Sequence, residues 1–418
     1  MTSQTHCSSP PATYPSEPES QEPPSWVVVA VSAVSLAIAM GIGRFSFTPI
    51  LPMMIADGAI ELSFGSSLAT SNYLGYLAGA MLCMGLPRVW SSATLVKWGL
   101  LITIGLTAGM CIQYEPLWLL LRLLSGAVSA IVFVHTTRWC LSILVARGQA
   151  AAGSLIFVGV GLGIALSGLA VTAMVSLGWS STSGWLSFTI LAATLLAITW
   201  SSFSNENAPS SSRSTPPPVP STVENKGEMA LFAFSYGLAG FGYIITATYL
   251  PVIARESLPP SAWLDLFWPA FGFAAVIGSL LATRRQLVRD PRWALTACYF
   301  VQAIGVITAA VWPTVSGFVV SSILAGLPFS AINFFAMDEV TRLRPHHAAR
   351  YMGLLTALYG IGQIAGPPMV NAIMSLGPDA RTGFDRSLKI AAASLLLGGL
   401  LYLVMEWKWP NKRGGKNG

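Results

Sequence analysis

Apolar stretches of about 20 residues follow one another along almost the whole chain, separated by short polar connections. Each is long enough to cross the hydrocarbon core of a bilayer as a helix. Backbone N–H and C=O groups find no water in that core, so each stretch must pair them internally. The pattern predicts twelve transmembrane helices, over residues 26–55, 63–87, 94–112, 116–143, 148–176, 183–203, 229–254, 262–283, 293–311, 315–338, 350–375 and 386–407.

The remaining residues fall into three polar stretches. Residues 1–25 are rich in Pro, Ser and Glu and contain no Lys or Arg, which predicts a disordered tail rather than a signal peptide. Residues 204–228 have the Ser/Pro-rich composition of a solvated linker, and residues 408–418 form a basic tail. The chain is therefore predicted to form two six-helix bundles, over residues 26–203 and 229–407.

The distribution of charge predicts an orientation. Hydrophobic residues make up 53% of the chain and charged residues 10%, whereas a soluble domain carries about a quarter charged residues. If both termini are cytoplasmic, seventeen of the 23 Lys and Arg residues fall on the cytoplasmic side and four outside. This excess follows the positive-inside rule. It predicts a multi-pass protein of the cytoplasmic (inner) membrane, with its tails and linker in the cytoplasm.

The two predicted bundles repeat each other. A Gly-x-Gly element followed by Leu-Pro occurs at Gly41 and Leu51 in the first span and, 199 residues later, at Gly240 and Leu250 in the seventh. Three further pairs of spans contain glycines at an offset of 199 or 200 residues: Gly79 and Gly278, Gly126 and Gly326, Gly161 and Gly360, and Gly163 and Gly362. Two parallel halves around an axis along the membrane normal are the organisation of one large class of transporters.

Six segments carry a resemblance to a known family: GIGRFSFTPILP (41–52), SNYLGYLAGA (71–80), RLLSGAVSA (122–130), GVGLGIALSG (159–168), GFGYIITATYLPVIAR (240–255) and LTALYGIGQIAGP (355–367). The chain resembles the major facilitator superfamily, and more closely its YbfB/YjiJ-like branch. The resemblance implies an all-α membrane protein with twelve helices in two pseudo-symmetric bundles, a central cavity, alternating access, H⁺ as the coupling ion and no cofactor. The Arg-x-x-x-Gly motif of the fourth span is intact at Arg122 and Gly126, which implies a structural or proton-coupling role.

Arg44 and Arg122 are the cationic side chains that the pattern places inside helices. An ionised side chain at the middle of a membrane costs at least about 2.5–3.5 kcal/mol. The resemblance places the first and fourth spans beside the cavity, where two guanidinium groups would favour an anion through paired hydrogen bonds. The alternative is that each arginine bonds backbone carbonyl groups and braces neighbouring helices.

Polar and aromatic residues in other spans are further candidate substrate contacts. Asn72 and Tyr76 lie four residues apart and share one face of the second span. The other candidates are Tyr243 (at the place of Arg44 in the repeat), Trp268, Asn333 and Gln363. Packing or lipid contact is the alternative for each of them.

Small residues four positions apart predict helix faces that allow close backbone approach. They are Gly75 and Gly79, Gly159 and Gly163, and Gly362 and Gly366, with Gly126 and Pro367 as further packing candidates. Tight packing is the plain interpretation; in a transporter such faces also act as sliding contacts.

Several functional classes find no support in the sequence. No nucleotide-binding loop of the form GxxxxGK[ST] occurs, which argues against an ATP-driven pump. Neither a metal-ligand cluster nor a nucleophile–base arrangement is visible, so neither a bound metal nor enzyme activity is expected. Carboxylates are scarce in the spans; Asp338 and Glu339, near Arg342 and Arg344, are expected to form a surface ion-pair cluster.

These patterns predict a secondary transporter that moves a small organic solute by rocking of its two bundles. Buried positive charge exceeds buried negative charge, so an organic anion or an amphipathic metabolite is the favoured substrate. Efflux of a hydrophobic or drug-like compound is one alternative, and a non-transporting membrane sensor is another. The expected partners are the lipid bilayer and the substrate, without nucleic acid, and the chain is expected to be a monomer.

Overall fold

The computed structural model describes residues 23–85, 90–203, 225–282, 290–344 and 348–410. Within these residues every regular element is a helix. Most of the predicted N-terminal tail, most of the predicted linker and most of the basic C-terminal tail lie outside the described residues.

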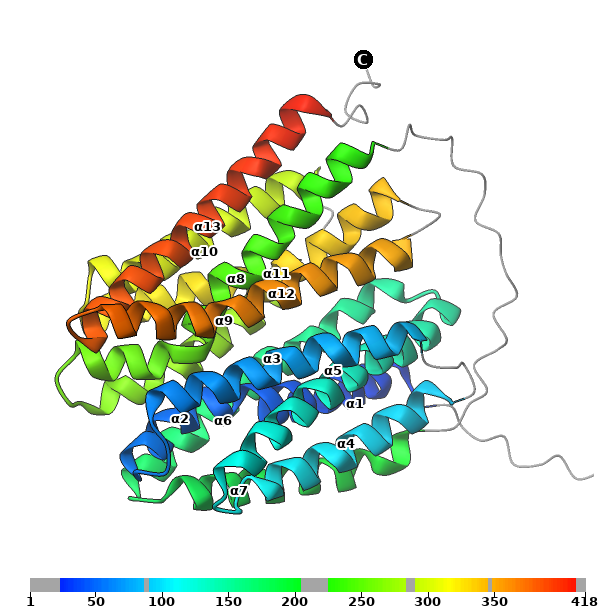
Figure 1. Ribbon diagram of the computed structural model, residues 1–418. Coiled ribbons are helices and arrows are strands. Elements are labelled where there is room, and N and C mark those ends of the chain that lie inside the picture. Colours follow the sequence, from blue (N-terminus) through cyan, green and yellow to red (C-terminus); the bar gives the residue numbers. More distant parts are fainter. Residues whose placement is uncertain (1–22, 86–89, 204–224, 283–289, 345–347, 411–418) are drawn as a thin grey trace, which may run out of the picture.

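Each half of the chain forms six membrane-length helical segments (Figure 1). The first half comprises α1 (Ser25–Leu36) with η1 (Ala37–Phe45) and α2 (Phe47–Ala56), α3 (Leu62–Gly85), α4 (Ser92–Gly109), α5 (Glu115–Ala146), η2 (Ala150–Phe157) with α6 (Val158–Ser176), and α7 (Ser181–Thr199) with η3 (Trp200–Ser202). The second half comprises α8 (Lys226–Ser257), η4 (Ala262–Leu266) with α9 (Phe267–Ala282), α10 (Pro291–Val311), α11 (Val315–Leu343), α12 (Ala348–Leu376) and α13 (Ala380–Lys408).

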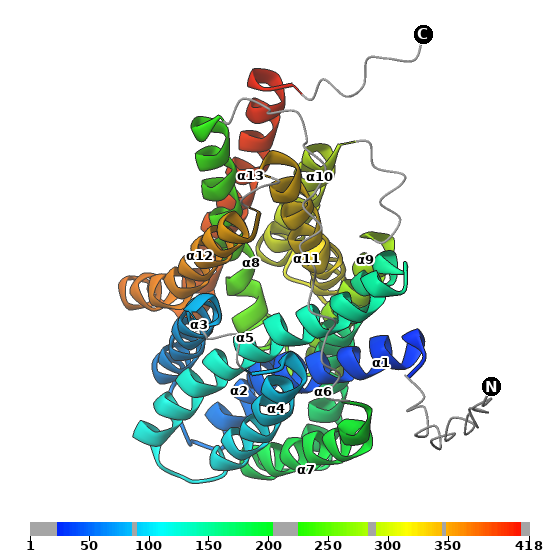
Figure 2. The same ribbon diagram turned by 90° about the vertical axis from the view of Figure 1, so that its right-hand side faces the viewer.

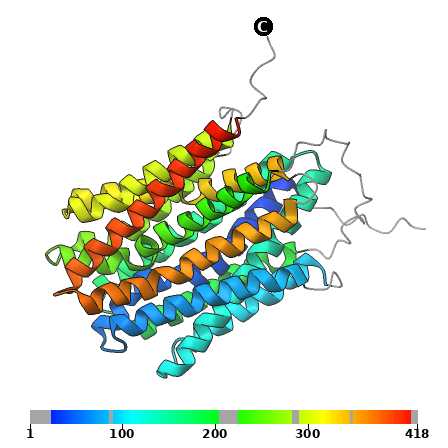
Figure 3. The same cartoon turned by 45° about the horizontal axis from the view of Figure 1, so that its top comes forward.

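The twelve predicted spans correspond one to one with these segments, and their ends agree to within six residues. The long helices run roughly parallel to one another (Figure 3). The predicted all-α fold with twelve helices is confirmed.

Polar side chains in the connections start many of the helices. The side chains of Ser91, Ser180, Asn225, Asp290, Thr314 and Asp379 accept hydrogen bonds from backbone N–H groups in the first turns of α4, α7, α8, α10, α11 and α13. Such caps satisfy N–H groups that have no partner within the helix. The same short connections that interrupt the hydrophobic pattern therefore fix where these helices begin.

The outer surface of the described chain suits a lipid environment. Ten of its helical segments are long and apolar enough to cross a membrane. Exposed tryptophans lie toward the helix ends, as expected of residues at a membrane–water interface. Near the side where α1 begins and α13 ends, called here the terminal side, they are Trp26, Trp90, Trp98, Trp200, Trp293 and Trp407; near the opposite, distal side they are Trp179, Trp263 and Trp312.

The internal repeat is visible in the helix packing. A Cβ on Gly126 of α5 would lie 1.9 Å from the carbonyl oxygen of Asn72 on α3, and a Cβ on Gly326 of α11 would lie 2.3 Å from that of Phe271 on α9. Asn72 and Phe271 are themselves 199 residues apart. Both contacts need a residue without a side chain, so the repeated glycines mark equivalent helix–helix crossings.

The two bundles meet along two flanks, with α3 beside α12 on one and α6 beside α9 on the other (Figure 2). Among the described residues, the hydrogen bonds between the bundles lie at the centre or toward the distal side. At the distal side, Thr48 donates to the carbonyl oxygen of Ala247 (2.6 Å), and Tyr249 donates to Ser66 (2.6 Å). Tyr73 also bonds Thr248 (2.7 Å), Asn371 bonds the Ser63 carbonyl (3.3 Å), and Thr172 bonds the Asp265 carbonyl (3.1 Å). The described bundles are thus joined by hydrogen bonds on the distal side.

The prediction that Glu339, at the end of the tenth span, belongs to a surface ion-pair cluster is wrong. This carboxylate is fully buried, where it accepts from Arg292 Nε (2.6 Å) and Arg342 Nε (2.7 Å). Arg292, buried as well, also bonds Glu228 and the carbonyl oxygen of Trp409 (2.8 Å). Four helices of the second bundle (α8, α10, α11 and α13) converge on these charges, which explains why a short sequence pattern on one helix did not reveal the burial.

Candidate functional site

The first span contains an irregular turn. Residues Ala37–Phe45 form a π-helical segment, a conformation that often occurs at functional sites. Gly41 in this segment lies so close to α6 that a Cβ on it would be 2.4 Å from the Cα of Gly163. After the segment the helix resumes with Pro52 inside it. Arg44 is therefore positioned by a distorted stretch of helix held tightly against α6.

Arg122 of α5 braces this turn. Its Nη1 donates to the carbonyl oxygen of Gly43 (3.2 Å) and its Nη2 to that of Arg44 (3.1 Å). Ser125, on the same helix, also donates to Gly43 (2.6 Å), and the Phe47 ring lies 4.6 Å from the Arg122 guanidinium carbon. A backbone carbonyl without a partner in hydrocarbon costs several kcal/mol, and a planar guanidinium bonds two at once. The bracing alternative describes what Arg122 does in this structure.

The side chain of Arg44 points instead at groups from both bundles. Its Nη2 donates to Oε1 of Gln363 on α12 (2.9 Å). Its guanidinium carbon lies 3.9 Å from the ring centre of Tyr76 and 5.3 Å from that of Tyr73, both on α3. The positive charge is almost fully buried, so it is held by a neutral amide and by aromatic faces.

Gln363 links Arg44 to an aromatic wall in the second bundle. Its amide nitrogen donates to the hydroxyl of Tyr243. The ring of Tyr243 stacks on Tyr359 (centroids 5.5 Å apart), which in turn lies 4.9 Å from the ring of Tyr236. Tyr236 donates to the side-chain oxygen of Asn333. Of the predicted site residues, Arg44, Tyr76, Tyr243, Gln363 and Asn333 are thus brought into one connected network.

Trp268 lies at the other end of the same aromatic group. It stacks on Phe271 (5.2 Å) and faces Phe45, the residue after Arg44, at 6.4 Å. Phe329 then joins Phe45 (5.9 Å) to Tyr243 (5.2 Å). The indole nitrogen of Trp268 and Nε of Arg44 are buried without a hydrogen-bond partner among the described residues. Buried polar groups are rarely left so, which makes these two donors available to a ligand.

Asn72 has a different position from its neighbour Tyr76. Its amide nitrogen donates to the carbonyl oxygen of Arg122 (3.0 Å), so it joins α3 to α5 rather than facing Arg44. Six aromatic residues of this network were absent from the sequence-based candidates: Phe45, Tyr73, Tyr236, Phe271, Phe329 and Tyr359. Their only sequence signal is aromatic character within a span, which packing residues share.

The predicted glycine faces pack helices within each bundle. Gly75, Gly79 and Gly126 bring α3 against α5, Gly159 and Gly163 bring α6 against the first span, and Gly362 and Gly366 bring α12 against α8, with Pro367 inside α12. Contacts between the bundles use other glycines. A Cβ on Gly272 of α9 would lie 2.4 Å from the backbone nitrogen of Ala165, and one on Gly168 2.6 Å from Pro269. These close backbone contacts between the bundles lie where α6 meets α9.

The centre of the described chain has an excess of positive charge. Neither Arg44 nor Arg122 forms an ion pair with a carboxylate there. The ion pairs found among the described residues lie toward helix ends: Arg255 with Asp265, Arg292 with Glu228, Glu339 and Glu406, Arg342 with Glu339, and Lys389 with Asp385. An acidic group supplied by a ligand would be the first carboxylate or phosphate near Arg44.

Comparison with known proteins identifies the family of the chain. The sequence matches the family model described as "Uncharacterised MFS-type transporter YbfB" over residues 36–403. The chain belongs to this family. The resemblance to the major facilitator superfamily is therefore confirmed, and the chain is a multi-pass membrane protein of a transporter family. No curated protein matches the sequence.

Among solved structures, a point mutant of the nucleoside transporter NupG superposes with a TM-score of 0.63. The alignment covers 91% of this chain and 99% of NupG, at 13% sequence identity. At that identity the likeness shows the fold alone, and it confirms the major facilitator fold with its two pseudo-symmetric bundles.

The different partners of the two arginines predict different effects on stability. Arg122→Gln removes the guanidinium that bonds both carbonyl groups; Gly43 keeps the hydroxyl of Ser125, so the buried Arg44 carbonyl is the one left without its donor, at a cost of roughly 1–3 kcal/mol. We expect its apparent Tm to fall by several degrees in a thermal unfolding assay of the purified protein. Arg44→Gln removes a buried charge that has only neutral partners, so its Tm should equal or exceed that of the parent.

Arg122→Lys provides the matched control, because an ammonium group keeps the charge without the planar fork. The Tm of Arg122→Lys should lie between those of the parent and of Arg122→Gln. If Arg122→Gln is as stable as the parent, the bracing role is wrong.

Proposed function

We propose that this protein is a secondary transporter of a small organic anion, with Arg44 as the group that binds the acidic end of the substrate. The observation that carries the proposal is the buried Arg44 guanidinium, which lies between the bundles and bonds a neutral amide rather than a carboxylate. A carboxylate or phosphate makes shorter and stronger hydrogen bonds to a guanidinium than an amide does. A substrate anion would therefore compete well with Gln363 for Arg44.

The aromatic wall supports an amphipathic or ring-containing substrate. In the first bundle Tyr76 faces the Arg44 guanidinium; in the second, Tyr243 bonds the same Gln363 and continues the wall through Tyr359 and Phe329. Asn333 and Trp268 would provide hydrogen bonds farther along the wall. In the present state these side chains contact one another, so the bundles must separate before a substrate can occupy the site.

The contact between Arg44 and Gln363 also supports coupling of binding to movement. Arg44 belongs to the first bundle and Gln363 to the second, and their hydrogen bond spans the interface at its centre. A substrate anion on Arg44 would release Gln363 and so remove the central link between the bundles. Binding of the substrate and opening of the interface between the bundles would then depend on the same residue, Arg44.

We further propose that the terminal side is cytoplasmic and that H⁺ is the coupling ion. The proposed membrane is the cytoplasmic (inner) membrane of the cell. The orientation is supported by the excess of Lys and Arg on the terminal side. The distal side would then face the outside, and the hydrogen bonds between the bundles there would close the protein on that side. The described residues place no carboxylate beside Arg44, so a proton would have to travel on the substrate or on groups nearer the helix ends.

The orientation predicts where the C-terminus lies. A reporter protein fused after residue 418 that is active only in the cytoplasm should be active, because the last helix ends on the terminal side. A reporter active only outside the cytoplasm should be silent at the same position. The reverse result would contradict the proposed orientation.

The proposed substrate class predicts a ligand-dependent shift in stability. The purified protein should be stabilised by a subset of organic anions in a thermal-shift screen of charged and neutral metabolites. A ligand at a hundredfold excess over its Kd adds about 2.7 kcal/mol by mass action. Arg44→Gln should abolish the shift and the corresponding uptake into proteoliposomes, while remaining folded and inserted.

Two outcomes separate this proposal from its alternative. Anions that stabilise the parent and not Arg44→Gln support the anion site and name the substrate class. Shifts produced only by cationic or neutral amphiphiles, equal in both proteins, would make Arg44 a structural residue and favour efflux of drug-like compounds.

The hydrogen bond between Arg44 and Gln363 provides a second test, in which the charge of Arg44 is kept and its partner is changed. Gln363→Glu places a carboxylate beside the Arg44 guanidinium, where it forms an ion pair across the interface and competes with any substrate anion. We expect loss of transport and of the anion-dependent shift, without loss of Tm. Gln363→Met, which removes the hydrogen bond and adds no charge, should keep the anion-dependent shift. If Gln363→Glu still transports the anion at the parental rate, Arg44 is not the binding group.

A further inference from the structure

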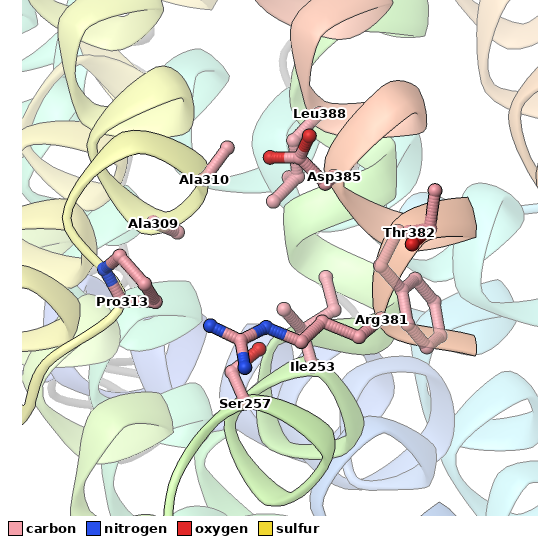
Figure 4. Close-up of a pocket in the computed structure, with 10 residues that line it drawn as sticks. Ile253, Ser257, Ala309, Ala310, Pro313, Arg381, Thr382, Asp385 and Leu388 are labelled. Carbon is pink, nitrogen blue, oxygen red and sulfur yellow. The ribbon is translucent and has the colours of Figure 1, made fainter. Parts of the chain in front are cut away.

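A second feature of the molecule lies far from the interface between the bundles. A cavity of about 230 Å³ opens at the distal ends of α8, α10 and α13 (Figure 4). One wall comes from Ile253 and Ser257 of α8, another from the end of α10 and Pro313 after it, and the third from the first turns of α13. It is smaller than a pocket for a drug-sized molecule, which is about 300–1,000 Å³. Its size suits a compact polar group.

The cavity contains a cation without an anionic partner. Arg381 extends across it, and its guanidinium group faces Ser257 and Pro313 (Figure 4). Among the described residues this guanidinium forms neither an ion pair nor a hydrogen bond. The acids nearest to it along the chain are Asp379 and Asp385: Asp385 bonds Lys389 (2.6 Å), and Asp379, whose charge also attracts Arg381, accepts from the backbone N–H of Thr382 (2.6 Å). The N–H donors of Arg381 are therefore free to bond a ligand.

The position of the cavity matches the headgroup region of a bilayer. The residues just before Pro313 are apolar and exposed: Val311 is 65% exposed and Trp312 is 48% exposed. An exposed tryptophan at a helix end is typical of the interface between lipid and water. A lipid beside α10 would therefore carry its phosphate at the height of Arg381, with its acyl chains along the apolar surface.

We propose that this cavity binds an oxyanion through Arg381, of the class provided by the phosphate of a lipid headgroup or by a free phosphate compound. The hydroxyl groups of Ser257 and Thr382, which also line the cavity, are the additional donors. Asp385, the acid that lines the cavity, is already paired with Lys389.

An occupant of the cavity would also act on the distal closure. Phe384, in the wall of the cavity, packs against the ring of Tyr249 (centroids 5.7 Å apart). Tyr249 in turn donates the hydrogen bond to Ser66 that joins the bundles on the distal side (2.6 Å). A ligand that fixes α13 against α8 would hold Tyr249 in place and favour the closed distal side.

The test uses the full-length protein carrying Arg44→Gln, so that no anion can act through the central site. Thermal shifts are measured against a short-chain phosphatidylglycerol, glycerol phosphate, inorganic phosphate and an uncharged diacylglycerol. Arg381→Gln is compared with Arg386→Gln, which makes the same charge change on the same helix outside the cavity. We expect phosphatidylglycerol to stabilise the Arg386→Gln protein, and Arg381→Gln to need at least tenfold more of it.

The probes distinguish the two sources of the oxyanion. A shift from phosphatidylglycerol alone identifies a lipid headgroup, and an equal shift from glycerol phosphate or inorganic phosphate identifies a free anion. If no phosphate-bearing probe gives a shift, or if Arg381→Gln and Arg386→Gln respond alike, the proposal is overturned. Because Arg381 is exposed, Arg381→Gln should fold, and Arg381→Lys should retain part of the response.

The link to the distal closure has a separate readout. Spin labels at Ser67 of α3 and Glu256 of α8, both exposed on the distal side, report the distance between the bundles. The phosphate compound that stabilises the protein in the thermal-shift test should move the distance distribution of the labels toward shorter values in Arg386→Gln. It should leave the distribution unchanged in Arg381→Gln. An equal shift in both variants would show that the cavity does not act on the closure.

Discussion

The hydrogen bonds from Arg122 to the carbonyl oxygens of Gly43 and Arg44 hold the irregular turn on which the central site depends. A helix in lipid has no water with which to satisfy a displaced carbonyl, so a π-helical turn needs donors from a neighbouring helix. Arg122 and Ser125 of α5 are those donors. Because they hold the turn, the Arg44 side chain can extend toward the second bundle. The two buried arginines therefore have different partners: Arg122 bonds the backbone of the turn, and Arg44 bonds a side chain of the second bundle.

The repeat explains why the interface lies where it does. Thr48 and Ala247 are 199 residues apart in the sequence and bond each other across the bundles. Arg44 and Tyr243 have the same offset, and both bond Gln363. Residues near the pseudo-symmetry axis thus face their own counterparts. At this axis the repeats differ most in chemistry, since a cation in one half is a phenol in the other, and the position equivalent to Gln363 is the apolar Ile164.

The span boundaries and the repeat could be predicted from the sequence because each depends on a strong local constraint. Bilayer thickness sets the length of every apolar stretch, and glycine is required where backbones cross at close distance. The difference between Arg44 and Arg122 could not be predicted, because it depends on how the first span distorts. The burial of Glu339 was missed for a similar reason: its partner Arg292 comes from another helix and was expected in a loop. Tyr73 and Tyr359 were missed because aromatic residues are common in membrane helices.

The strength of the contacts between the bundles bears on how the protein can change state. Those on the distal side are hydrogen bonds between neutral groups, each worth about 0.5–1.5 kcal/mol net, so no single one locks the interface. The central contact differs, because Arg44 carries a charge while Gln363 does not. A ligand that brings a negative charge replaces the weaker acceptor with a stronger one. If Arg44 binds the substrate as proposed, the free energy gained there would be available to part the bundles, and a neutral ligand at the same position would lack this means of opening them.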